Sequence, residues 1–220
     1  MFVLDGTSQD SHTANTVEVL SAINITPEMI IVGIPNSDRN RDLTPHYLYR
    51  GFEDEDSTKG AGDNFLSFME KELIPFVDEK YRTTNYKMLA GHSRGGLFAL
   101  YALLEKPDLF DAYFCYSPAF WREDNLIVKK AGSFFNSRDS LDTFLYMSLG
   151  TNENEKMEKG FEAMVEILKG LNVKSLETHH DYTRNADHQT NAYYSTPVAL
   201  KEWAVTQKEV SQQKAPAPKN

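Results

Sequence analysis

Short, mostly apolar runs alternate with longer amphipathic stretches along the chain. The short runs predict six strands, at residues 2–4, 29–34, 86–90, 112–116, 143–149 and 173–179. The longer stretches predict helices at 13–23, 64–81, 95–106, 156–171 and 191–210. Strands that alternate with helices in this way favour an α/β fold, with a mostly parallel sheet and helices on both of its faces.

Two of the predicted helices carry further signals. In helix 64–81 the apolar positions recur at spacings of three and four and form one face: Phe65, Met69, Leu73 and Phe76. Pro75 predicts a local kink, because proline has no N–H to donate within a helix. The helix at 95–106 is apolar nearly all round, which predicts that it is buried.

Two polar segments interrupt this order. Residues 36–63 predict a solvated loop, whose acidic run at 53–56 lacks the spaced ligands of a calcium-binding loop. Residues 211–220 are polar and proline-rich, which predicts a disordered tail. The folded domain is therefore expected to span residues 1–210.

Composition and charge narrow the class of protein. With 220 residues, of which 40% are apolar, the chain can bury the core of one globular domain. The net charge of −9 disfavours a nucleic-acid partner, because the phosphates would be repelled. No apolar run approaches the ~18 residues of a membrane helix, so no membrane partner is expected. The single cysteine, Cys115, lies in a predicted strand and is interpreted as a buried thiol.

A G-x-S-x-G pattern formed by Gly91, Ser93 and Gly95 lies between a predicted strand and a predicted helix. In a sharp strand-to-helix turn the serine backbone is strained, and small residues two positions away on either side relieve the crowding. The serine oxygen is then exposed where the helix N-terminus favours negative charge. The pattern predicts Ser93 as a nucleophile; the alternative is a glycine-rich turn with a structural serine.

A serine nucleophile needs a base, and in this arrangement the chain order is serine, acid, histidine. Three histidines follow Ser93: His179, His180 and His188. His188 lies in the loop between the last predicted strand and the closing helix, where the topology would bring it over the nucleophile. We therefore predict His188 as the base, with His179 as the alternative.

The acid is expected in the loop after the strand at 143–149, where Glu153 is the first candidate and Glu155 the second. An acidic residue at this place also favours the dipole of the next helix without any catalytic role. The oxyanion hole is expected to use the amide of Arg94 and the turn at Gly6 and Thr7, although a plain turn glycine is the alternative.

A metal site is not expected in this chain. The sequence His179-His180-Asp181 offers three ligand types, but adjacent residues of a strand point to opposite faces. The predicted serine chemistry needs no cofactor either.

Several segments together resemble the putative-esterase family of α/β hydrolases, and within it the branch of enterobactin-type siderophore esterases. The similar segments lie at 4–6, 41–45, 60–65, 72–75, 90–96 and 117–121. The resemblance implies an α/β-hydrolase fold that cleaves esters, with Ser93 and His188 carried over by position. It also implies that the first strands of the fold are missing from this chain.

The resemblance leaves two points open at the site. Arg94 occupies a position that the family usually fills with an apolar or aromatic residue. Some members of the branch work with a Ser–His dyad, so a role for Glu153 is not fixed by the family. Trp121 and Arg94 are expected to flank the substrate. A tryptophan of the core and an arginine of the surface, without any contact to substrate, are the alternatives.

The sequence therefore predicts a serine hydrolase that cleaves carboxylic esters through an acyl-enzyme on Ser93. The substrate is expected to be a small molecule, either a siderophore of the trilactone type or a simpler ester. The alternatives are an acyltransferase with the same site and a non-catalytic binding domain. No export signal opens the chain, so the cytoplasm is the default expectation, and the periplasm or secretion is expected if a longer precursor exists.

Overall fold

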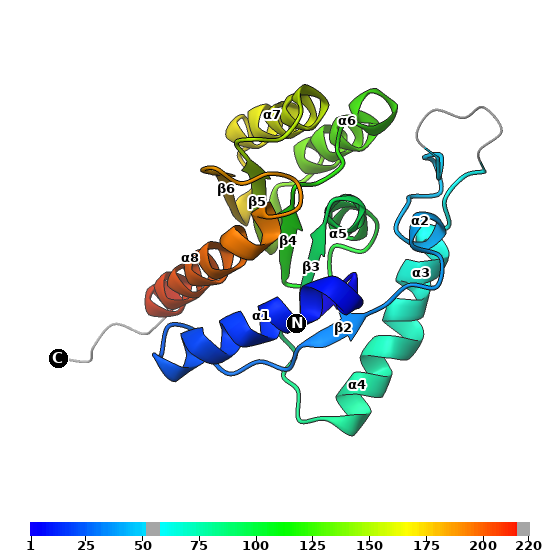
Figure 1. The fold of residues 1–220 in the computed structure, drawn as a ribbon. Helices are drawn as coiled ribbons and strands as arrows, with labels where there is room; N and C mark the ends of the chain where they lie inside the picture. Colours follow the sequence, from blue (N-terminus) through cyan, green and yellow to red (C-terminus); the bar gives the residue numbers. More distant parts are fainter. Residues whose placement is uncertain (52–57, 215–220) are drawn as a thin grey trace.

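One six-stranded parallel sheet forms the centre of the molecule. The computed structural model describes residues 1–51 and 58–214 of the chain. The strand order is β2-β1-β3-β4-β5-β6 (Figure 1). The strands are β1 (Phe2–Leu4), β2 (Val32–Ile34), β3 (Met88–His92), β4 (Ala112–Tyr116), β5 (Ser140–Gly150) and β6 (Lys174–Thr183). All five pairings are parallel, so the carboxyl ends of the strands meet at one edge of the sheet.

Helices cover both faces of this sheet, as the alternation of strands and helices predicted (Figure 1). One face carries α1 (Gly6–Ala22) and α8 (Asn191–Lys214). The other carries α3 (Gly62–Phe68), the π-helical turn η1 (Met69–Leu73), α4 (Ile74–Lys80), α5 (Arg94–Glu105), α6 (Arg122–Asn136) and α7 (Glu155–Lys169). A short helix, α2 (Arg39–Asp42), follows β2.

The strand residues divide between two cores because successive side chains of a strand point to opposite faces. In β3, Leu89 packs with the α5 side, whereas Met88 and Ala90 pack with α1 and α8. In β4, Cys115 is fully buried on the α5 side, which confirms the predicted buried thiol, and burial raises the pKa of that thiol. The sheet is thus covered by helices on both faces.

All six predicted strands are present, and four of them, β2, β3, β5 and β6, have bounds that differ from the prediction. β2 is shorter than the predicted run at 29–34, since the pairing with β1 begins at Val32. β6 is longer than the predicted strand at 173–179, because it pairs with β5 as far as Thr183. The extension was not predicted because the residues at the end of β6 are polar.

The helices differ from the sequence prediction at several places, one of which is α2, within the segment at 36–63 that was predicted as a loop. α1 begins at Gly6, seven residues before the predicted start, because its first buried positions are the polar or small residues Gly6, Gln9 and Thr13. α6 was not predicted, since its first turn is polar. In the structure the backbone of this turn is left-handed at residues 123–125. The disturbance expected at Pro75 takes the form of the π-helical turn η1 immediately before it.

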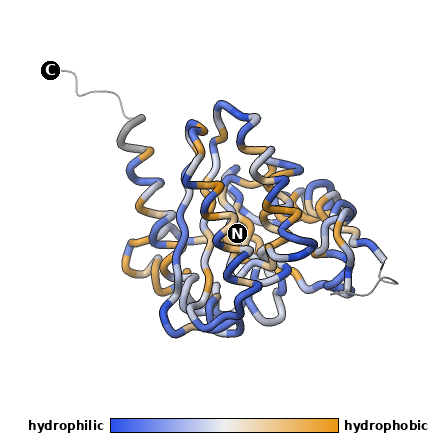
Figure 2. The backbone as a smooth tube through the Cα atoms, turned by 90° about the horizontal axis from the view of Figure 1, so that it is seen from above, coloured by the Kyte–Doolittle hydropathy of each residue, from blue (hydrophilic) through white to orange (hydrophobic). Residues whose placement is uncertain are grey.

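The end of the chain corrects the predicted tail in part. α8 continues to Lys214, four residues beyond the predicted end, since residues 211–215 contain no glycine or proline before Pro216. The second half of α8 extends beyond the other helices (Figures 1 and 2). The rest of the predicted tail, 215–220, and the acidic run at 53–56 lie outside the described residues. In the described part of the chain, no helix is long and apolar enough to span a membrane.

Candidate active site

The three residues predicted for acyl transfer lie together at the carboxyl edge of the sheet. Ser93 directly follows β3, Glu153 follows β5 and His188 follows β6. Because the strands are parallel, the turns after them all open at the same edge. Residues that are 35 to 95 positions apart in the chain therefore meet there.

Ser93 lies in a strained turn between β3 and α5. Its backbone has φ 58 and ψ −113, a conformation that side-chain-bearing residues rarely adopt. A Cβ on Gly91 would lie 2.3 Å from the carbonyl carbon of Gly95, so this turn requires glycine at position 91. The amide of Ser93 donates to the carbonyl of Tyr116 on β4 at 2.9 Å, which ties the turn to the sheet. The G-x-S-x-G spacing thus follows from the packing of the turn.

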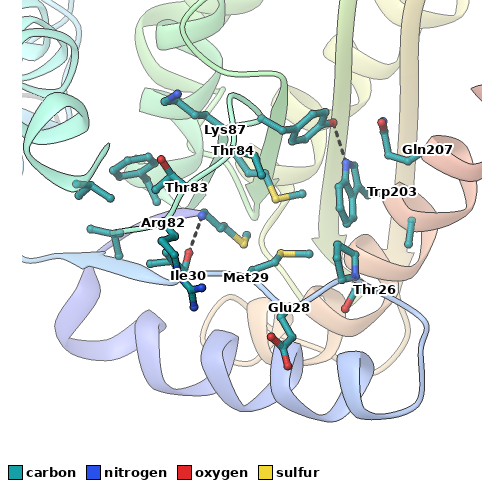
Figure 3. A pocket seen from close by; sticks show the side chains of 18 of the residues that line it. Thr26, Glu28, Met29, Ile30, Arg82, Thr83, Thr84, Lys87, Trp203 and Gln207 are labelled. Carbon is teal, nitrogen blue, oxygen red and sulfur yellow. Dashed lines mark hydrogen bonds between the residues drawn. The ribbon is translucent and has the colours of Figure 1, made fainter. Parts of the chain in front are cut away.

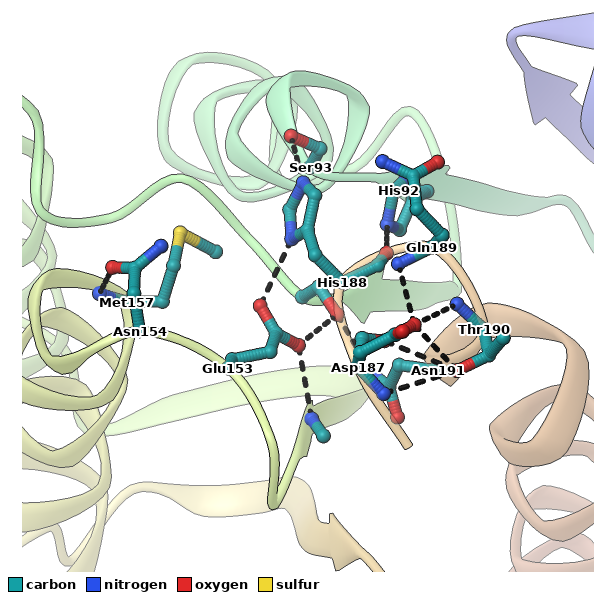
Figure 4. A network of polar contacts seen from close by, with 12 residues as sticks. His92, Ser93, Glu153, Asn154, Met157, Asp187, His188, Gln189, Thr190 and Asn191 are labelled. Atoms are coloured by element: carbon teal, nitrogen blue, oxygen red, sulfur yellow. Dashed lines mark hydrogen bonds and ion pairs between the residues drawn. The ribbon is translucent and has the colours of Figure 1, made fainter. Parts of the chain in front are cut away.

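A continuous chain of hydrogen bonds joins Ser93, His188 and Glu153 (Figure 4). The Nε2 atom of His188 lies 3.0 Å from Ser93 Oγ, and its Nδ1 atom lies 2.9 Å from Glu153 Oε2. With Nδ1–H donated to the carboxylate, Nε2 is left as an acceptor for the serine hydroxyl. This is the arrangement that makes a serine hydroxyl nucleophilic.

Glu153 is held as a buried carboxylate. Its side chain is 1% exposed, and it accepts hydrogen bonds from Ser117 Oγ at 2.5 Å and from the amide of Gly150 at 2.9 Å. Burial alone would raise the pKa of this carboxyl, but the hydrogen bonds from His188, Ser117 and Gly150 together lower it below its ordinary value. An ionised Glu153 accepts the Nδ1–H of His188 and so fixes the orientation of the ring.

The two alternative residues make other contacts. Glu155, the second candidate for the acid, is the first residue of α7 and pairs with Lys159 one turn later at 2.5 Å. His179, the alternative base, lies in the middle of β6, where its ring stacks on Phe144 at 5.2 Å. Neither side chain is in the hydrogen-bonded chain of Ser93, His188 and Glu153.

A buried polar relay behind Glu153 was missed by the sequence analysis. Asn191, the first residue of α8, donates from Nδ2 to Ser117 Oγ at 2.9 Å and to Ser148 Oγ at 3.0 Å. All three side chains are fully buried. The only sequence signal for them was the presence of serines at the end of, or within, apolar strands. The relay orients the hydroxyl of Ser117 toward Glu153.

His92, next to Ser93, holds the loop that carries His188. Its Nε2 lies 2.6 Å from the backbone carbonyl of His188, and the two rings are 4.7 Å apart (Figure 4). Because a carbonyl only accepts, Nε2 of His92 carries the proton. Burial, together with the nearby His188, lowers the pKa of His92 to about 4.

The residues predicted for the oxyanion hole occupy the first turns of two helices. Gly6 and Thr7 open α1, and Arg94 opens α5, so their N–H groups have no partner within the helix. The reason for glycine at position 6 differs from the expected close approach at the site. A Cβ there would lie 2.4 Å from the amide nitrogen of Ile34, so the glycine is required by packing against β2.

A cavity of about 560 Å³ lies over Ser93 and His188. Its other lining residues are Arg39, Asn40, Arg94, Ala119, Trp121, Arg122, Asn154, Glu155, Lys156 and Met157. Trp121, predicted to contact the substrate, lines this cavity and donates from Nε1 to the sulfur of Met157 at 3.0 Å. The lining thus contains four basic side chains and one acidic one, although the whole chain carries a net charge of −9.

A larger cavity, of about 780 Å³, lies at the opposite edge of the sheet, between α8, β3 and the segment before β2 (Figure 3). Its wall is mainly apolar and includes Met29, Met88 and Trp203. None of Ser93, Glu153 and His188 lines it, so the cavity at the carboxyl edge is the candidate active site.

Comparison with known proteins agrees with this site. Residues 1–214 match the model of the family described as Putative esterase. The chain belongs to this esterase family. A siderophore enterobactin esterase of Emericella nidulans is 33% identical to it over 153 residues, which are 61% of this chain and 50% of that protein. A ferri-bacillibactin esterase of Bacillus subtilis is 32% identical over 46% of this chain and 35% of that protein.

A solved structure supports the fold of this family member. An IroE-like serine hydrolase from Shewanella oneidensis superposes with a TM-score of 0.85 at 26% identity, covering 96% of this chain and 74% of that chain. The parallel sheet and this likeness confirm the predicted α/β-hydrolase fold and the resemblance to enterobactin-type esterases. The chain spans about half or less of the length of the curated relatives it matches.

Proposed function

We propose that this esterase-family chain is a serine hydrolase that cleaves carboxylic esters through an acyl-enzyme on Ser93. The observation that carries the proposal is the chain of hydrogen bonds from Ser93 Oγ through His188 to Glu153. The chain lies in a cavity at the carboxyl edge of the sheet, beside the N-terminus of α5. A nucleophile, a base and an orienting carboxylate are the groups that acyl transfer needs.

The reaction proceeds in two halves. In the first, Ser93 Oγ attacks the ester carbonyl while its proton passes to Nε2 of His188. The tetrahedral intermediate collapses when His188 returns that proton to the leaving alcohol, and the acyl group stays on Ser93. In the second, a water molecule loses a proton to His188 and attacks the acyl-enzyme. When this second intermediate collapses, His188 passes the proton to Ser93 Oγ, which restores the serine hydroxyl and releases the carboxylic acid. The amide of Arg94 and the turn at Gly6 and Thr7 are proposed to hold the oxyanion.

A siderophore ester is the substrate class that we propose. Two relatives that match this chain bear names of siderophore esterases, and four basic side chains line the cavity. A siderophore that holds iron through deprotonated oxygens is an anionic ester, which basic side chains would attract in an otherwise acidic protein. The cavity of about 560 Å³ is of the size of a small-molecule site.

The experiment that tests this proposal is a panel of esters followed by mass spectrometry of the products. We expect hydrolysis of a trilactone siderophore, with and without iron, at a higher kcat/KM than that of p-nitrophenyl acetate or butyrate. Hydrolysis of only the simple esters would contradict the substrate class. Transfer of the acyl group to an added alcohol in place of water would favour the acyltransferase, and binding without turnover would favour a binding domain.

Glu153→Gln is expected to lower kcat by about 10²- to 10⁴-fold, because an amide can neither stabilise the imidazolium of His188 nor enforce its tautomer. The measurement is steady-state kinetics on the best ester of the panel. Glu155→Gln is the matched comparison, and it should retain most of the activity because the Glu153–His188 contact stays in place. Equal and small effects of the two changes would favour a Ser–His dyad.

A further inference from the structure

The carboxylate of Glu153 divides its contacts between two side chains. Oε2 lies 2.9 Å from Nδ1 of His188, whereas Oε1 accepts from the hydroxyl of Ser117 at 2.5 Å and from the amide of Gly150 at 2.9 Å. Because only 1% of this side chain is exposed, its charge must be stabilised by donors of the protein. The hydroxyl of Ser117 thus serves Oε1 as the imidazole of His188 serves Oε2.

The direction of the hydrogen bonds behind Glu153 follows from the types of atoms. An ionised carboxylate only accepts, so Ser117 donates its single hydrogen to Glu153, and its oxygen can accept in turn. Asn191 supplies that donor, since its Nδ2 lies 2.9 Å from Ser117 Oγ and 3.0 Å from Ser148 Oγ. Oδ1 of Asn191 lies 2.8 Å from the hydroxyl of Ser195. Each polar atom of the Asn191 side chain therefore has a partner, which fixes the orientation of its amide.

Ser117 occupies its place despite backbone strain. It directly follows β4 and has φ 43, in the left-handed region that favours glycine. Its own amide donates to the carbonyl of Ser148 on β5 at 2.8 Å, which holds the strained residue against the sheet. Strain of this kind is concentrated at functional sites. Glycine would relieve the strain but would leave Oε1 of Glu153 without its side-chain donor.

We propose that Ser117 and Asn191 are positioning residues for the acid of the site. Asn191 directs the hydroxyl hydrogen of Ser117 toward Glu153, and this bond keeps the carboxylate ionised and turned toward Nδ1 of His188. Neither Ser117 nor Asn191 lines the cavity over Ser93, so neither is expected to contact the ester. The inference rests on the proposed ester hydrolysis and deepens it, because it assigns a role to two residues outside the chain of Ser93, His188 and Glu153.

The test compares Ser117→Ala with Ser148→Ala on the best ester of the panel. Each change removes a buried hydroxyl that accepts from Nδ2 of Asn191, but of the two hydroxyls it is that of Ser117 that donates to Glu153. We expect Ser117→Ala to lower kcat by about 10- to 10²-fold with little change in KM, because a displaced carboxylate leaves His188 misplaced. Ser148→Ala should lower Tm by a similar amount and kcat by much less.

A double variant shows whether Ser117 acts through Glu153. Combining Ser117→Ala with Glu153→Gln should cost little beyond Glu153→Gln alone, because groups that act as a unit are not additive. Asn191→Asp should lower kcat at least as much as Ser117→Ala, since an oxygen in place of Nδ2 competes with Glu153 for the hydrogen of Ser117. Ser117→Cys keeps a weak donor of similar size, so its kcat should lie between those of wild type and Ser117→Ala.

The pH profile of kcat/KM is a readout that a loss of packing alone would not move. Glu153 interacts with two titratable side chains of the site: His188, to which it is hydrogen-bonded, and His92, whose ring lies 4.7 Å from that of His188. Burial raises the pKa of Glu153, and the hydrogen bonds from His188, Ser117 and Gly150 lower it. Loss of the Ser117 bond should therefore raise this pKa and move the acid limb of the profile to higher pH, whereas Ser148→Ala should move the limb much less.

Thermal unfolding of each variant separates positioning from folding, and Ser117→Cys and Asn191→Asp carry the test if Ser117→Ala does not fold. A kcat of Ser117→Ala close to that of wild type would overturn the inference, and so would equal losses of kcat in Ser117→Ala and Ser148→Ala. Full additivity in the double variant would also overturn it.

Failure of the inference and failure of the proposed function can be told apart. If Glu153→Gln retains wild-type activity, Ser117 and Asn191 have no acid to position, and the inference fails while ester hydrolysis stands. If folded wild type hydrolyses no ester, the proposed function fails and the inference fails with it.

Discussion

Ser93→Ala is expected to abolish ester hydrolysis almost completely, with kcat/KM lowered by about 10⁴-fold or more. The methyl group of alanine cannot attack a carbonyl, and His188 would have no proton to accept. What activity remains would come from water attacking an ester held by the cavity and the oxyanion donors. The measurement is steady-state hydrolysis of the best ester, with enzyme at high concentration so that the residual rate can be resolved.

The fold should survive this change, since alanine is close in size to serine and the bonds from the Ser93 amide and carbonyl are backbone bonds. Thermal unfolding should therefore show a Tm close to that of wild type. Ser133→Ala is the control, because Ser133 lies on α6 and its hydroxyl donates to the carbonyl of Lys129 one turn earlier. Substantial turnover by Ser93→Ala would contradict the assignment of Ser93 as the nucleophile.

His188→Ala is expected to have an effect of similar size, about 10⁴-fold or more in kcat, because Ser93 would lose its only proposed proton acceptor. The loss should fall on kcat, since no ground-state contact with the ester is assigned to the imidazole. Combining His188→Ala with Ser93→Ala should cost little beyond either change alone, because the two groups act as a unit. Steady-state kinetics on the single and double variants measures this.

His179→Gln serves as the matched histidine control for that prediction. Its ring packs against Phe144 and lies 3.4 Å from the hydroxyl of Thr206 on α8, on the helix-covered face of β6. We expect this variant to hydrolyse the ester at nearly the wild-type rate. A severe loss with His179→Gln and a mild one with His188→Ala would reverse the assignment of the base.

Part of the site could be predicted from the sequence because it depends on contiguous residues. The turn at Ser93 follows from a strand, a short glycine-flanked segment and a helix that are adjacent in the chain. The expected order of the parallel strands then favoured, as the base, a histidine in the loop after the last strand. The choice between Glu153 and Glu155 could not be made in this way, because it depends on which carboxylate turns back toward the sheet. Of the two, Glu153 does so, and its carboxylate accepts a hydrogen bond from the amide of Gly150.

The residues that the sequence did not reveal make contacts across long separations. Arg39 is 34 positions from Asp5, and Asn191 is 74 positions from Ser117. Arg39 lies in a stretch that is polar throughout, so no local pattern distinguishes it from its solvated neighbours. The early start of α1 was hidden for a related reason. Its buried face begins with polar residues, whose burial is decided by the strands and helices around them.

The central claim is that the hydroxyl of Ser93, activated by His188, is a working nucleophile. The most direct measurement is reaction with a fluorophosphonate, followed by intact-mass analysis and peptide mapping. We predict one adduct per chain on Ser93 in wild type, none in Ser93→Ala, and much slower formation in His188→Ala. Folded wild-type protein that takes up no phosphonate, or takes it up on a residue other than Ser93, would contradict the claim.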